Sequence, residues 1–322
     1  MGKKSTTASK VSLPSALAYS ASASLIAATQ AEAVTNEITQ AVNPVISGLA
    51  DAGNGLPLAV GSAAAIAGLA FLLATTDPEK RRTDMATEAG GDEMKSVKDY
   101  FNTVGFERWE KIYGETEEVN KVQLDIRTGH AKTVSKVINW LKEDGELSKG
   151  ITVCDAGCGT GSLSIPLALE GASINASDIS SAMAGEAEKR CQAALEAAGT
   201  TPAVAPKFEA NDLESISGKY HTVTCLDVMI HYPQDKADAM ITHLASLADD
   251  RLIISFAPKT LAYSILKRIG ELFPGPSKAT RAYLHYEEDV EKALNAAGWK
   301  VCRREMTATS FYFSRLLEAK RA

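Results

Sequence analysis

The chain has 322 residues, of which 45% are hydrophobic, and a formal net charge of −6. This length accommodates one sizeable α/β domain with additional segments, and the composition excludes a chain that is disordered throughout. The acidic balance argues against a protein that binds nucleic acid, which usually presents a basic face, so we expect a small-molecule substrate.

The first 50 residues have the composition of a targeting leader. Residues 1–31 contain three lysines and no acidic residue, and Ser, Thr and Ala are frequent among them. Organelle transit peptides have this composition, whereas the apolar stretch 25–28 and the small-residue motif at 31–33 also resemble a secretory signal and its cleavage site. We therefore expect residues 1–50 to be a targeting leader or disordered, and the type of leader stays open.

An uncharged apolar segment follows the leader. Residues 52–76 contain no charged side chain, and 56–74 has about the length of a helix that crosses a membrane. Basic residues at 80–82 follow, so the positive-inside rule predicts that the rest of the chain faces the cytoplasm-like side, which in a plastid is the stroma. Because Ala and Gly contribute little to insertion, a cleaved leader or a surface-lying helix is the alternative. We expect 51–76 to be a transmembrane or membrane-associated helix and 77–95 to be a solvated linker.

Residues 96–148 are predicted to form a helical cap. An aromatic-rich stretch with helical spacing contains Tyr100, Phe101, Phe106, Trp109, Ile112 and Tyr113. Such a stretch either packs as ordinary core or presents an apolar surface to a flat ligand. Between 119 and 141 apolar residues recur at intervals of three and four, which predicts one long amphipathic helix that ends near Gly145. We expect Arg127 and His130 to lie on the solvated face of this helix, with a contact to a ligand carboxylate as the alternative.

Strands and helices then alternate along the chain. The strands are predicted at 151–156, 173–177, 206–210, 221–228 and 251–256. The helices between them are predicted at 163–169, 182–198 and 237–247. This alternation requires right-handed crossovers and a mainly parallel sheet with helices on both faces, which is an α/β, Rossmann-like fold. Residues 149–322 are therefore the predicted catalytic domain.

A glycine-rich loop joins the first strand to the first helix of this domain. The sequence VCDAGCGTG places Gly157, Gly159 and Gly161 two residues apart, with Asp155 before them. Glycines at this spacing let the backbone turn tightly and approach a ligand, and the acid can accept a hydrogen bond from the amino group of S-adenosylmethionine. The rival dinucleotide fingerprint fits less well, because its third glycine position falls on Ser162 and Asp155 would repel a pyrophosphate. A plain strand-to-helix turn is the remaining alternative.

Acidic residues also follow the other strands, at the edge where ligands bind in parallel α/β sheets. Asp178 is expected to accept hydrogen bonds from both ribose hydroxyls, although a nicotinamide enzyme has an acid at a similar spacing. Asp212, beside the Leu213 amide, is expected to receive the adenine amino group or to cap a turn. Asp227 is expected inside the fourth strand. The predicted cofactor-binding residues are Asp155, Gly157, Cys158, Gly159, Gly161, Asp178, Ile179, Asp212, Leu213 and Asp227.

The cysteines do not predict a metal site or a disulfide framework. They are Cys154, Cys158, Cys191, Cys225 and Cys302, and no two form a CxxC pair. We therefore expect reduced thiols and no protein-bound metal. Three of them fall in stretches that are expected to be buried strands, among them Cys302. Cys158 is the exception, because a partly exposed thiol in the glycine loop would be open to oxidation.

Four segments identify a known family. They are YFNTVGFERWEKIYGE at 100–115, VNKVQLDIRTGHAKTV at 119–134, VCDAGCGTGSLSIPLALEGASINASDIS at 153–180 and CLDVMIHYP at 225–233. These segments resemble the magnesium protoporphyrin IX O-methyltransferases of chlorophyll biosynthesis, which are class I S-adenosylmethionine-dependent methyltransferases. The cofactor motif indicates only the superfamily, and the other segments point to this family. The resemblance spans roughly residues 97–320 and implies the class I fold with a seven-stranded sheet.

The resemblance also implies a reaction and two catalytic residues. The methyl group of S-adenosylmethionine is transferred to one propionate of magnesium protoporphyrin IX, giving the 13-monomethyl ester and S-adenosylhomocysteine. The family's cap tyrosine and its histidine after the fourth strand match Tyr113 and His231. Because a propionic acid has a pKa near that of Glu, about 4.3, it is already ionised at neutral pH, so we expect both residues to hold the propionate rather than to remove a proton. An axial contact from His231 to the porphyrin magnesium, and ordinary packing of either side chain, are the alternatives.

Partners and location are implied by the same resemblance. They are the porphyrin-carrying subunit of magnesium chelatase and a chloroplast membrane, thylakoid or envelope, with the catalytic domain facing the stroma. Two rival functions stay open: a methyltransferase that acts on a quinol or phenol, and a membrane-tethered porphyrin carrier without catalysis.

The C-terminal part departs from the alternation. The apolar, proline-containing stretch 258–285 interrupts it and is expected to form part of the porphyrin pocket. A helix is then predicted at 287–297. Two last strands, at 299–306 and 311–318, are expected to add an antiparallel hairpin at one edge of the sheet.

Overall fold

The computed structural model describes residues 98, 100–113, 119–147, 150–261, 263, 264, 267 and 283–322. The predicted leader (1–50), the predicted membrane-associated segment (51–76) and the predicted linker (77–95) lie outside these residues. Among the helices that these residues form, none has the length and hydropathy needed to span a bilayer.

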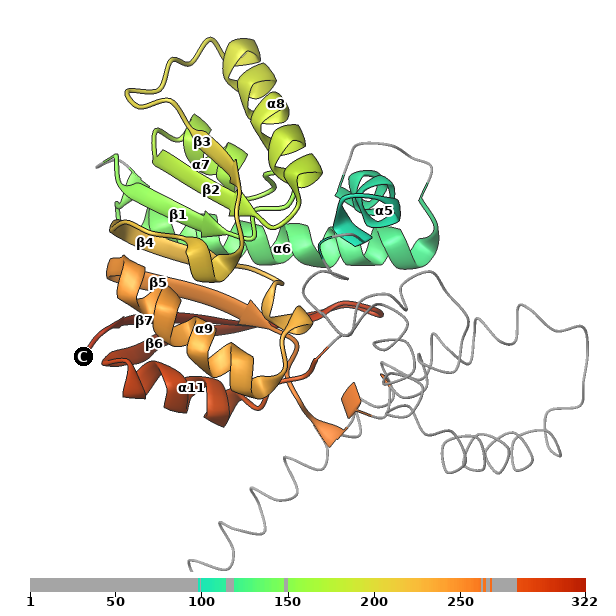
Figure 1. The fold of residues 1–322 in the computed structure, drawn as a ribbon, viewed down its shortest axis with the longest axis vertical. Helices are drawn as coiled ribbons and strands as arrows, with labels where there is room; N and C mark the ends of the chain where they lie inside the picture. The colour runs from blue at the N-terminus through green and yellow to red at the C-terminus, as the bar shows by residue number, and fades with distance from the viewer. Residues whose placement is uncertain are drawn as a thin grey trace, which may run out of the picture. The chain divides into compact units, whose positions relative to one another are not determined.

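A seven-stranded sheet organises the fold (Figure 1). Its strands are β1 (Thr152–Ala156), β2 (Ser173–Asp178), β3 (Lys207–Ala210), β4 (Tyr220–Cys225), β5 (Ala248–Phe256), β6 (Trp299–Ala308) and β7 (Phe313–Arg321). They lie in the order β3-β2-β1-β4-β5-β7-β6. The first five are parallel, whereas β7 is antiparallel to both β5 and β6. The chain order reverses between β1 and β4, and this switch point is where open α/β sheets bind ligands.

The predicted strands are present, and the terminal hairpin at one edge of the sheet is confirmed. Among the strands whose bounds differ from the prediction, β5 begins at Ala248, β7 spans Phe313–Arg321, and the strand expected at 221–228 ends at Cys225. Asp227 lies beyond it with φ +59°, a left-handed conformation that a residue other than glycine rarely adopts. The chain therefore leaves the sheet before Asp227, which is not inside the fourth strand.

Helices cover both faces of the sheet. One layer contains α9 (Gln234–Leu247) and α11 (Glu287–Ala296). The other contains α6 (Lys121–Glu143), α7 (Ser164–Leu169) and α8 (Ser181–Ala197). Because successive side chains of a strand point to opposite faces, β1, β5 and β7 each supply both layers. In β5, for example, Leu252 and Ile254 pack in the first layer and Ile253 in the second.

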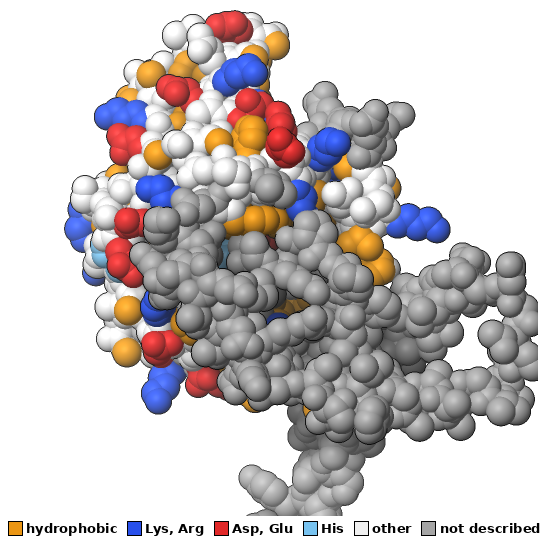
Figure 2. All heavy atoms as spheres, turned by 45° about the vertical axis from the view of Figure 1, so that its right-hand side comes forward, with side chains coloured by type: hydrophobic (Ala, Val, Ile, Leu, Met, Phe, Trp, Pro, Cys, Tyr) orange, Lys and Arg blue, Asp and Glu red, His pale blue; other side chains and the backbone are white. Residues whose placement is uncertain are grey.

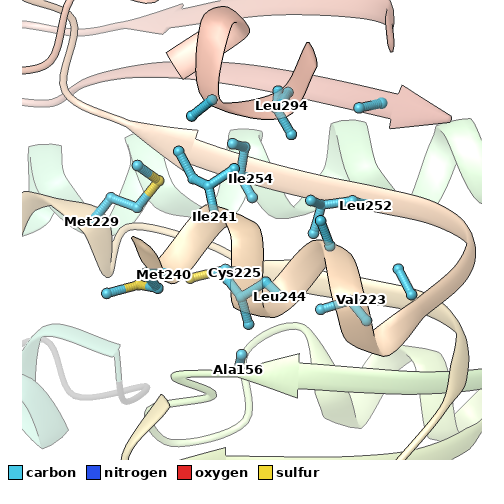
Figure 3. Close-up of a cluster of buried hydrophobic side chains, with 14 of the residues drawn as sticks. Ala156, Val223, Cys225, Met229, Met240, Ile241, Leu244, Leu252, Ile254 and Leu294 are labelled. Atoms are coloured by element: carbon cyan, nitrogen blue, oxygen red, sulfur yellow. The ribbon is translucent and has the colours of Figure 1, made fainter. Parts of the chain in front are cut away.

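The first layer is a close-packed apolar core (Figure 3). Ile241 and Leu244 of α9 pack against Leu252 and Ile254 of β5, and Leu294 of α11 lies beside them. All five side chains are fully buried. This packing holds the carboxyl ends of β4 and β5 in a fixed position, which is what a binding site at that edge requires.

The cap consists of α5 (Val104–Tyr113) and α6. Asn120 begins α6 with a capping box: its side chain accepts from the amide of Gln123 at 2.9 Å, and the Gln123 side chain accepts from the amide of Asn120 at 3.0 Å. The Arg127 guanidinium then reaches the end of α5 and donates to the carbonyl oxygens of Ile112 and Lys111, at 2.5 and 2.6 Å. Arg127 is half-buried, and its side chain fastens α5 to α6, a contact that the sequence did not predict.

Candidate active site

The glycine loop folds back over the end of β2. The amides of Gly157 and Cys158 both donate to the carbonyl oxygen of Ser177, at 2.8 and 2.9 Å. The amide of Gly159 donates to the carboxylate of Asp178 at 3.0 Å. Gly157 and Gly159 have φ values of +81° and +53°, a region that favours glycine. The loop is therefore fixed by its own backbone at the switch point of the sheet.

Space around the loop differs between its two sides. A Cβ atom on Gly157 would lie 2.2 Å from Cγ2 of Val228, so a side chain there would collide with the segment after β4. A Cβ atom on Gly159 would have no described atom within 4 Å. The loop is closed against the protein at Gly157 and open at Gly159, which fits a backbone that a ligand approaches closely.

Asp155 lies inside the protein and braces the loop. Its side chain is 2% exposed and accepts hydrogen bonds from the hydroxyls of Ser164 and Thr224, at 2.5 and 2.9 Å. Burial raises the pKa of this carboxyl group. These contacts join β1 to α7 and β4, and the bond from Asp155 to a cationic amino group stays a prediction.

Asp178 lies at the carboxyl end of β2, where a ligand on the open side of the loop would meet it. One carboxylate oxygen accepts from the amide of Gly159 at 3.0 Å and the other from the amide of Ser180 at 2.9 Å. Burial raises the pKa of Asp178 to about 6, although both amide bonds favour the ionised form. Ile179, beside it, is half-buried. Asp178 is thus held in place by two backbone amides, and its contact with ribose hydroxyls stays a prediction.

Asp212 acts as a cap in the structure. It precedes the short 3-10 helix η2 (Leu213–Ser215), and its carboxylate accepts from the amide of Ser215 at 2.8 Å. Leu213 is 5% exposed and belongs to the core. The structure therefore shows the turn-capping alternative, and the contact of Asp212 and Leu213 with adenine stays a prediction.

Two expectations about cysteines are wrong. Cys158 is buried, with 5% exposure, because the loop packs its side chain against the second core layer. Burial, together with the neighbouring charges of Asp155 and Asp178, raises the pKa of this thiol well above its usual value. Cys302 was expected in a buried strand, but it is exposed on the edge strand β6.

His231 ends the short 3-10 helix η3 (Met229–His231), four residues after Asp227. Its ring lies edge-on to the ring of Phe101, with 5.4 Å between centroids and an angle of 79°. Phe101 is also 6.5 Å from Trp109 of α5. The aromatic stretch of the cap therefore meets the predicted catalytic histidine. Tyr113 is the last residue of α5.

Hydrogen bonds also connect the cap to the segment that follows β2. The Ser180 hydroxyl lies 3.0 Å from both the carbonyl oxygen of Phe101 and Oδ1 of Asn102. The amide of Ala182 donates to the same Oδ1 at 3.4 Å. The segment 100–102 therefore connects the loop after Asp178 with His231. Phe101 was predicted only as part of an aromatic stretch and Asn102 was missed, because an asparagine before a helix has many other roles.

Tyr283 and His285 support the turn that carries His231. The amide of Tyr283 donates to the carbonyl oxygen of Ile230 at 2.7 Å. The fully buried ring of His285 lies 2.9 Å from the carbonyl oxygen of Met229 and 2.7 Å from the side chain of Gln234. The end of the stretch 258–285 thus contacts the turn that carries His231, whereas residues 262, 265, 266 and 268–282 lie outside the described residues, and its place in a porphyrin pocket stays a prediction.

His130 and Asp227 lie together beneath the site. His130 is 7% exposed, so the expectation of a solvated helix face is wrong. Its ring lies 2.7 Å from the carboxylate of Asp227 and 2.7 Å from the hydroxyl of Ser162. The carboxylate of Asp227 is hydrogen-bonded to protein groups, and its predicted role in cofactor binding stays a prediction.

The surface around the cap carries charges of both signs. On the face shown in Figure 2, Lys and Arg side chains are interspersed with Asp and Glu side chains. An open groove of about 590 Å³ lies between α6 and β6, and Arg127, Lys132 and Lys136 contribute to its lining. None of the predicted site residues lines this groove. The candidate active site is therefore the region at the switch point, not this groove.

Comparisons of sequence indicate the family of the chain. The family described as magnesium-protoporphyrin IX methyltransferase C-terminus matches residues 225–321, and a methyltransferase domain matches residues 153–250. The chloroplastic magnesium protoporphyrin IX methyltransferase of Arabidopsis thaliana is 63% identical over 81% of this chain and 82% of its own length. A magnesium-protoporphyrin O-methyltransferase of Synechocystis is 56% identical over 73% of this chain and 100% of its own length.

Solved structures give the same result. The crystal structure of the Synechocystis magnesium protoporphyrin IX methyltransferase with bound S-adenosylhomocysteine matches with a TM-score of 0.63 and 55% identity, covering 70% of this chain and 98% of that chain. The structure of that enzyme with bound S-adenosylmethionine matches with a TM-score of 0.62 and 50% identity, covering 72% and 98%. The chain has the class I methyltransferase fold, as predicted, and it belongs to the magnesium protoporphyrin IX methyltransferase family.

Proposed function

We propose that this protein transfers the methyl group of S-adenosylmethionine to a propionate carboxylate of magnesium protoporphyrin IX, giving the 13-monomethyl ester and S-adenosylhomocysteine. One observation carries the proposal: the open glycine loop and the turn of His231 meet under an aromatic cap, in a chain that is 63% identical to the Arabidopsis enzyme. The reaction is part of chlorophyll biosynthesis.

The donor is held by the loop and by Asp178. The open face at Gly159 lets the backbone approach the cofactor, and the carboxylate of Asp178 accepts from the ribose hydroxyls. Ile179 packs beside the adenine, and Asp212 with the Leu213 amide receives the adenine amino group. Asp155 supports the loop from inside. When bound, S-adenosylmethionine supplies a methyl group whose bond to sulfur breaks as the bond to the acceptor oxygen forms, with the electron pair leaving on sulfur.

The acceptor is held by His231 and Tyr113. A propionate is already ionised at neutral pH, so neither residue removes a proton. Each holds the carboxylate by a hydrogen bond, which fixes the direction of its attacking oxygen. The reaction cancels the charge of the carboxylate against that of the sulfonium, so exclusion of water favours it. The ring of Phe101 against His231 supplies part of that apolar cover.

Location and partners complete the proposal. The relative from Arabidopsis is named as chloroplastic, so we place this protein in the chloroplast, with residues 1–50 as its transit peptide. Residues 51–76 associate with the thylakoid or envelope membrane, and the catalytic domain faces the stroma. The porphyrin-carrying subunit of magnesium chelatase delivers the substrate.

Incubation of the purified protein with magnesium protoporphyrin IX and methyl-labelled cofactor tests the function. We expect the labelled monomethyl ester by chromatography and mass spectrometry. Methylation of a quinol or phenol, without formation of the porphyrin ester, would favour a methyltransferase with that other substrate. Porphyrin binding without a calorimetric signal for S-adenosylmethionine would favour the carrier. Metal-free protoporphyrin as a parallel substrate reports whether the magnesium takes part in recognition.

A further inference from the structure

A buried histidine of the cap lies between the two halves of the active site. His130 of α6 is hydrogen-bonded through both ring nitrogens: Nδ1 lies 2.7 Å from Oδ2 of Asp227, and Nε2 lies 2.7 Å from Oγ of Ser162. Both distances are those of strong hydrogen bonds. With 7% exposure, the imidazole is held by protein groups rather than by solvent.

Its two partners belong to the two segments that the reaction must bring together. Ser162 directly follows Gly161, the last glycine of the loop that we assign to the donor. Asp227 lies two residues before η3, the turn that carries His231 and that we assign to the acceptor. The imidazole therefore contacts both segments at once.

Asp227 is itself a rigid point of attachment. One oxygen accepts from the hydroxyls of Ser255 and Ser314, at 2.8 and 3.0 Å, and the other accepts from the hydroxyl of Tyr312 at 2.7 Å in addition to its bond with His130. Burial acts to raise the pKa of this carboxyl group, but the hydrogen bond and charge of His130, with the hydroxyls, hold it below its usual value. An ionised acceptor with four partners holds the backbone at its strained φ of +59°.

The shape of an imidazole suits this position. Its two nitrogens have fixed positions on either side of one carbon of a rigid ring, so a shift of one bonded segment is transmitted to the other. Methyl transfer is sensitive to such shifts, because a misplacement of about 1 Å at a reacting centre can cost roughly 100-fold in rate. A flexible side chain with two hydrogen bonds would transmit less.

We propose that His130 is a positioning residue for the methyl transfer: it couples the glycine loop that holds the donor to the turn that carries His231, and so fixes the separation of donor and acceptor. The proposal rests on the proposed function for its effect on rate. The coupling itself is a property of the protein that the binding of S-adenosylhomocysteine alone reveals.

Two substitutions separate the two hydrogen bonds. In His130→Asn the amide takes the place of Nδ1 and keeps the contact with Asp227, whereas in His130→Gln it takes the place of Nε2 and keeps the contact with Ser162. Each variant breaks the connection but retains one bond. We expect both to lower the single-turnover rate roughly 10- to 100-fold. The Kd of S-adenosylhomocysteine by calorimetry and that of the porphyrin by fluorescence quenching should stay within about threefold.

Two further variants serve as comparison. Ser162→Ala removes the same connection as His130→Asn, so it should have a similar rate, and the double variant should be no slower than either. His221→Asn is the matched control, because His221 lies at the amino end of β4 and interacts with Thr222 and Glu146. It should turn over at the rate of the unmodified protein.

Hydrogen exchange gives a readout that does not depend on turnover. S-adenosylhomocysteine should slow exchange of the turn amides of His231 and Tyr232, which donate to Val228 and Met229, and should do so much less in both isosteric variants. A protein that makes no methyl ester would refute the proposed function yet still show this coupling. The role of His130 would be overturned if either variant had the single-turnover rate of the unmodified protein. It would also be overturned if cofactor affinity fell as much as the rate, or if protection of the turn amides were undiminished in both variants.

Discussion

At the scale of single residues, the acids of the site differ in what they touch. The carboxylate of Asp155 is bonded to two hydroxyls inside the protein, and Asp178 is bonded to backbone amides at the edge of the loop. Both have a raised pKa because of burial, yet only Asp178 lies where the loop is open. Both acids were predicted to bind the cofactor, and their partners show that Asp155 supports the fold from inside, whereas the contact of Asp178 with a ligand stays a prediction.

The assignment of donor and acceptor residues predicts opposite kinetic effects. His231→Ala should lower kcat about 100-fold while the Kd of S-adenosylmethionine changes little, because the histidine orients the propionate. Asp178→Ala should mainly raise that Kd, because it removes an acceptor for the ribose hydroxyls. Calorimetry with single-turnover assays separates the two effects. Equal losses of cofactor affinity in both variants would contradict the assignment.

Cofactor affinity should also depend on pH through Asp178. Its pKa of about 6 means that the carboxyl group becomes protonated as the pH falls through 6 and then accepts hydrogen bonds less well. The Kd of S-adenosylhomocysteine should therefore rise below pH 6 and be flat above about pH 7. In Asp178→Asn the affinity should be lower and this step absent. A step of the same size in that variant would assign the titration to another group.

The same raised pKa affects stability with the opposite sign. The folded-state pKa lies above the ordinary value of 3.8, so the folded protein binds this proton more tightly than the unfolded chain does. The contribution of Asp178 to stability is therefore present at low pH and is lost as the pH rises through about 6. Above about pH 6 the folded protein therefore holds a buried charge at Asp178.

At the scale of elements, the glycine loop is defined by backbone conformation. Gly157 and Gly159 both have positive φ, but only Gly157 is also in close contact with the chain after β4. The loop and the segment from Val228 to His231 are thus fitted to one another at Gly157. A side chain at Gly157 would therefore disturb both the loop and the segment after β4.

Gly157→Ala should disrupt this fit. Its new Cβ atom would lie 2.2 Å from Val228 at a φ of +81°, so the loop must move. We expect loss of cofactor binding by calorimetry and a loss of stability of more than about 1–2 kcal/mol, the cost of the left-handed conformation alone. Gly199→Ala is the control, because its φ is +61° and a Cβ there has no described atom within 4 Å. It should lose about 1–2 kcal/mol in denaturant unfolding with unchanged affinity, and similar affinity in both variants would disprove the fit.

At the scale of the whole described fold, a buried charge network joins elements at the end of the sheet opposite the site. Arg251 of β5 and Glu318 of β7 are fully buried, with Nε and Oε1 2.8 Å apart. Arg251 also pairs with Asp144 at the end of α6, and Arg303 of β6 contacts both acids. The hydrogen bond from Arg303 is the main reason that the pKa of Asp144 is lowered. The network connects the cap helix to the antiparallel hairpin.

Removal of one charge from this network should destabilise the fold. Glu318→Gln leaves Arg251 buried without its full counter-charge, and we expect a loss of about 3–5 kcal/mol in urea unfolding. Glu291→Gln is the control, since Glu291 pairs with Arg304 at 2.9 Å on the surface and should contribute about 0–1 kcal/mol. Both variants should keep their cofactor affinity at temperatures where they remain folded. An equal loss of stability in the two would show that burial does not matter here.

Local features of the sequence determined most of the fold and, within the site, the glycine loop. Hydrophobic periodicity fixed the order and the approximate bounds of the strands and helices, because side chains of period two or 3.6 must share a face. Residue type fixed the glycine loop, since positive φ at Gly157 and Gly159 is a property of those residues themselves. His231 and Tyr113 came from the resemblance of their segments to a known family.

Only the tertiary structure decided what His130, Arg127 and Asp227 do. The partners of His130 are 97 and 32 residues away in the chain, so neither its spacing on the helix nor its residue type indicates them. Burial of Cys158 and exposure of Cys302 were misjudged for a similar reason. A pattern along the chain reports which side of an element is apolar. Which distant group meets a given side chain depends on how the elements pack, and the link between donor loop and acceptor turn arises at that level.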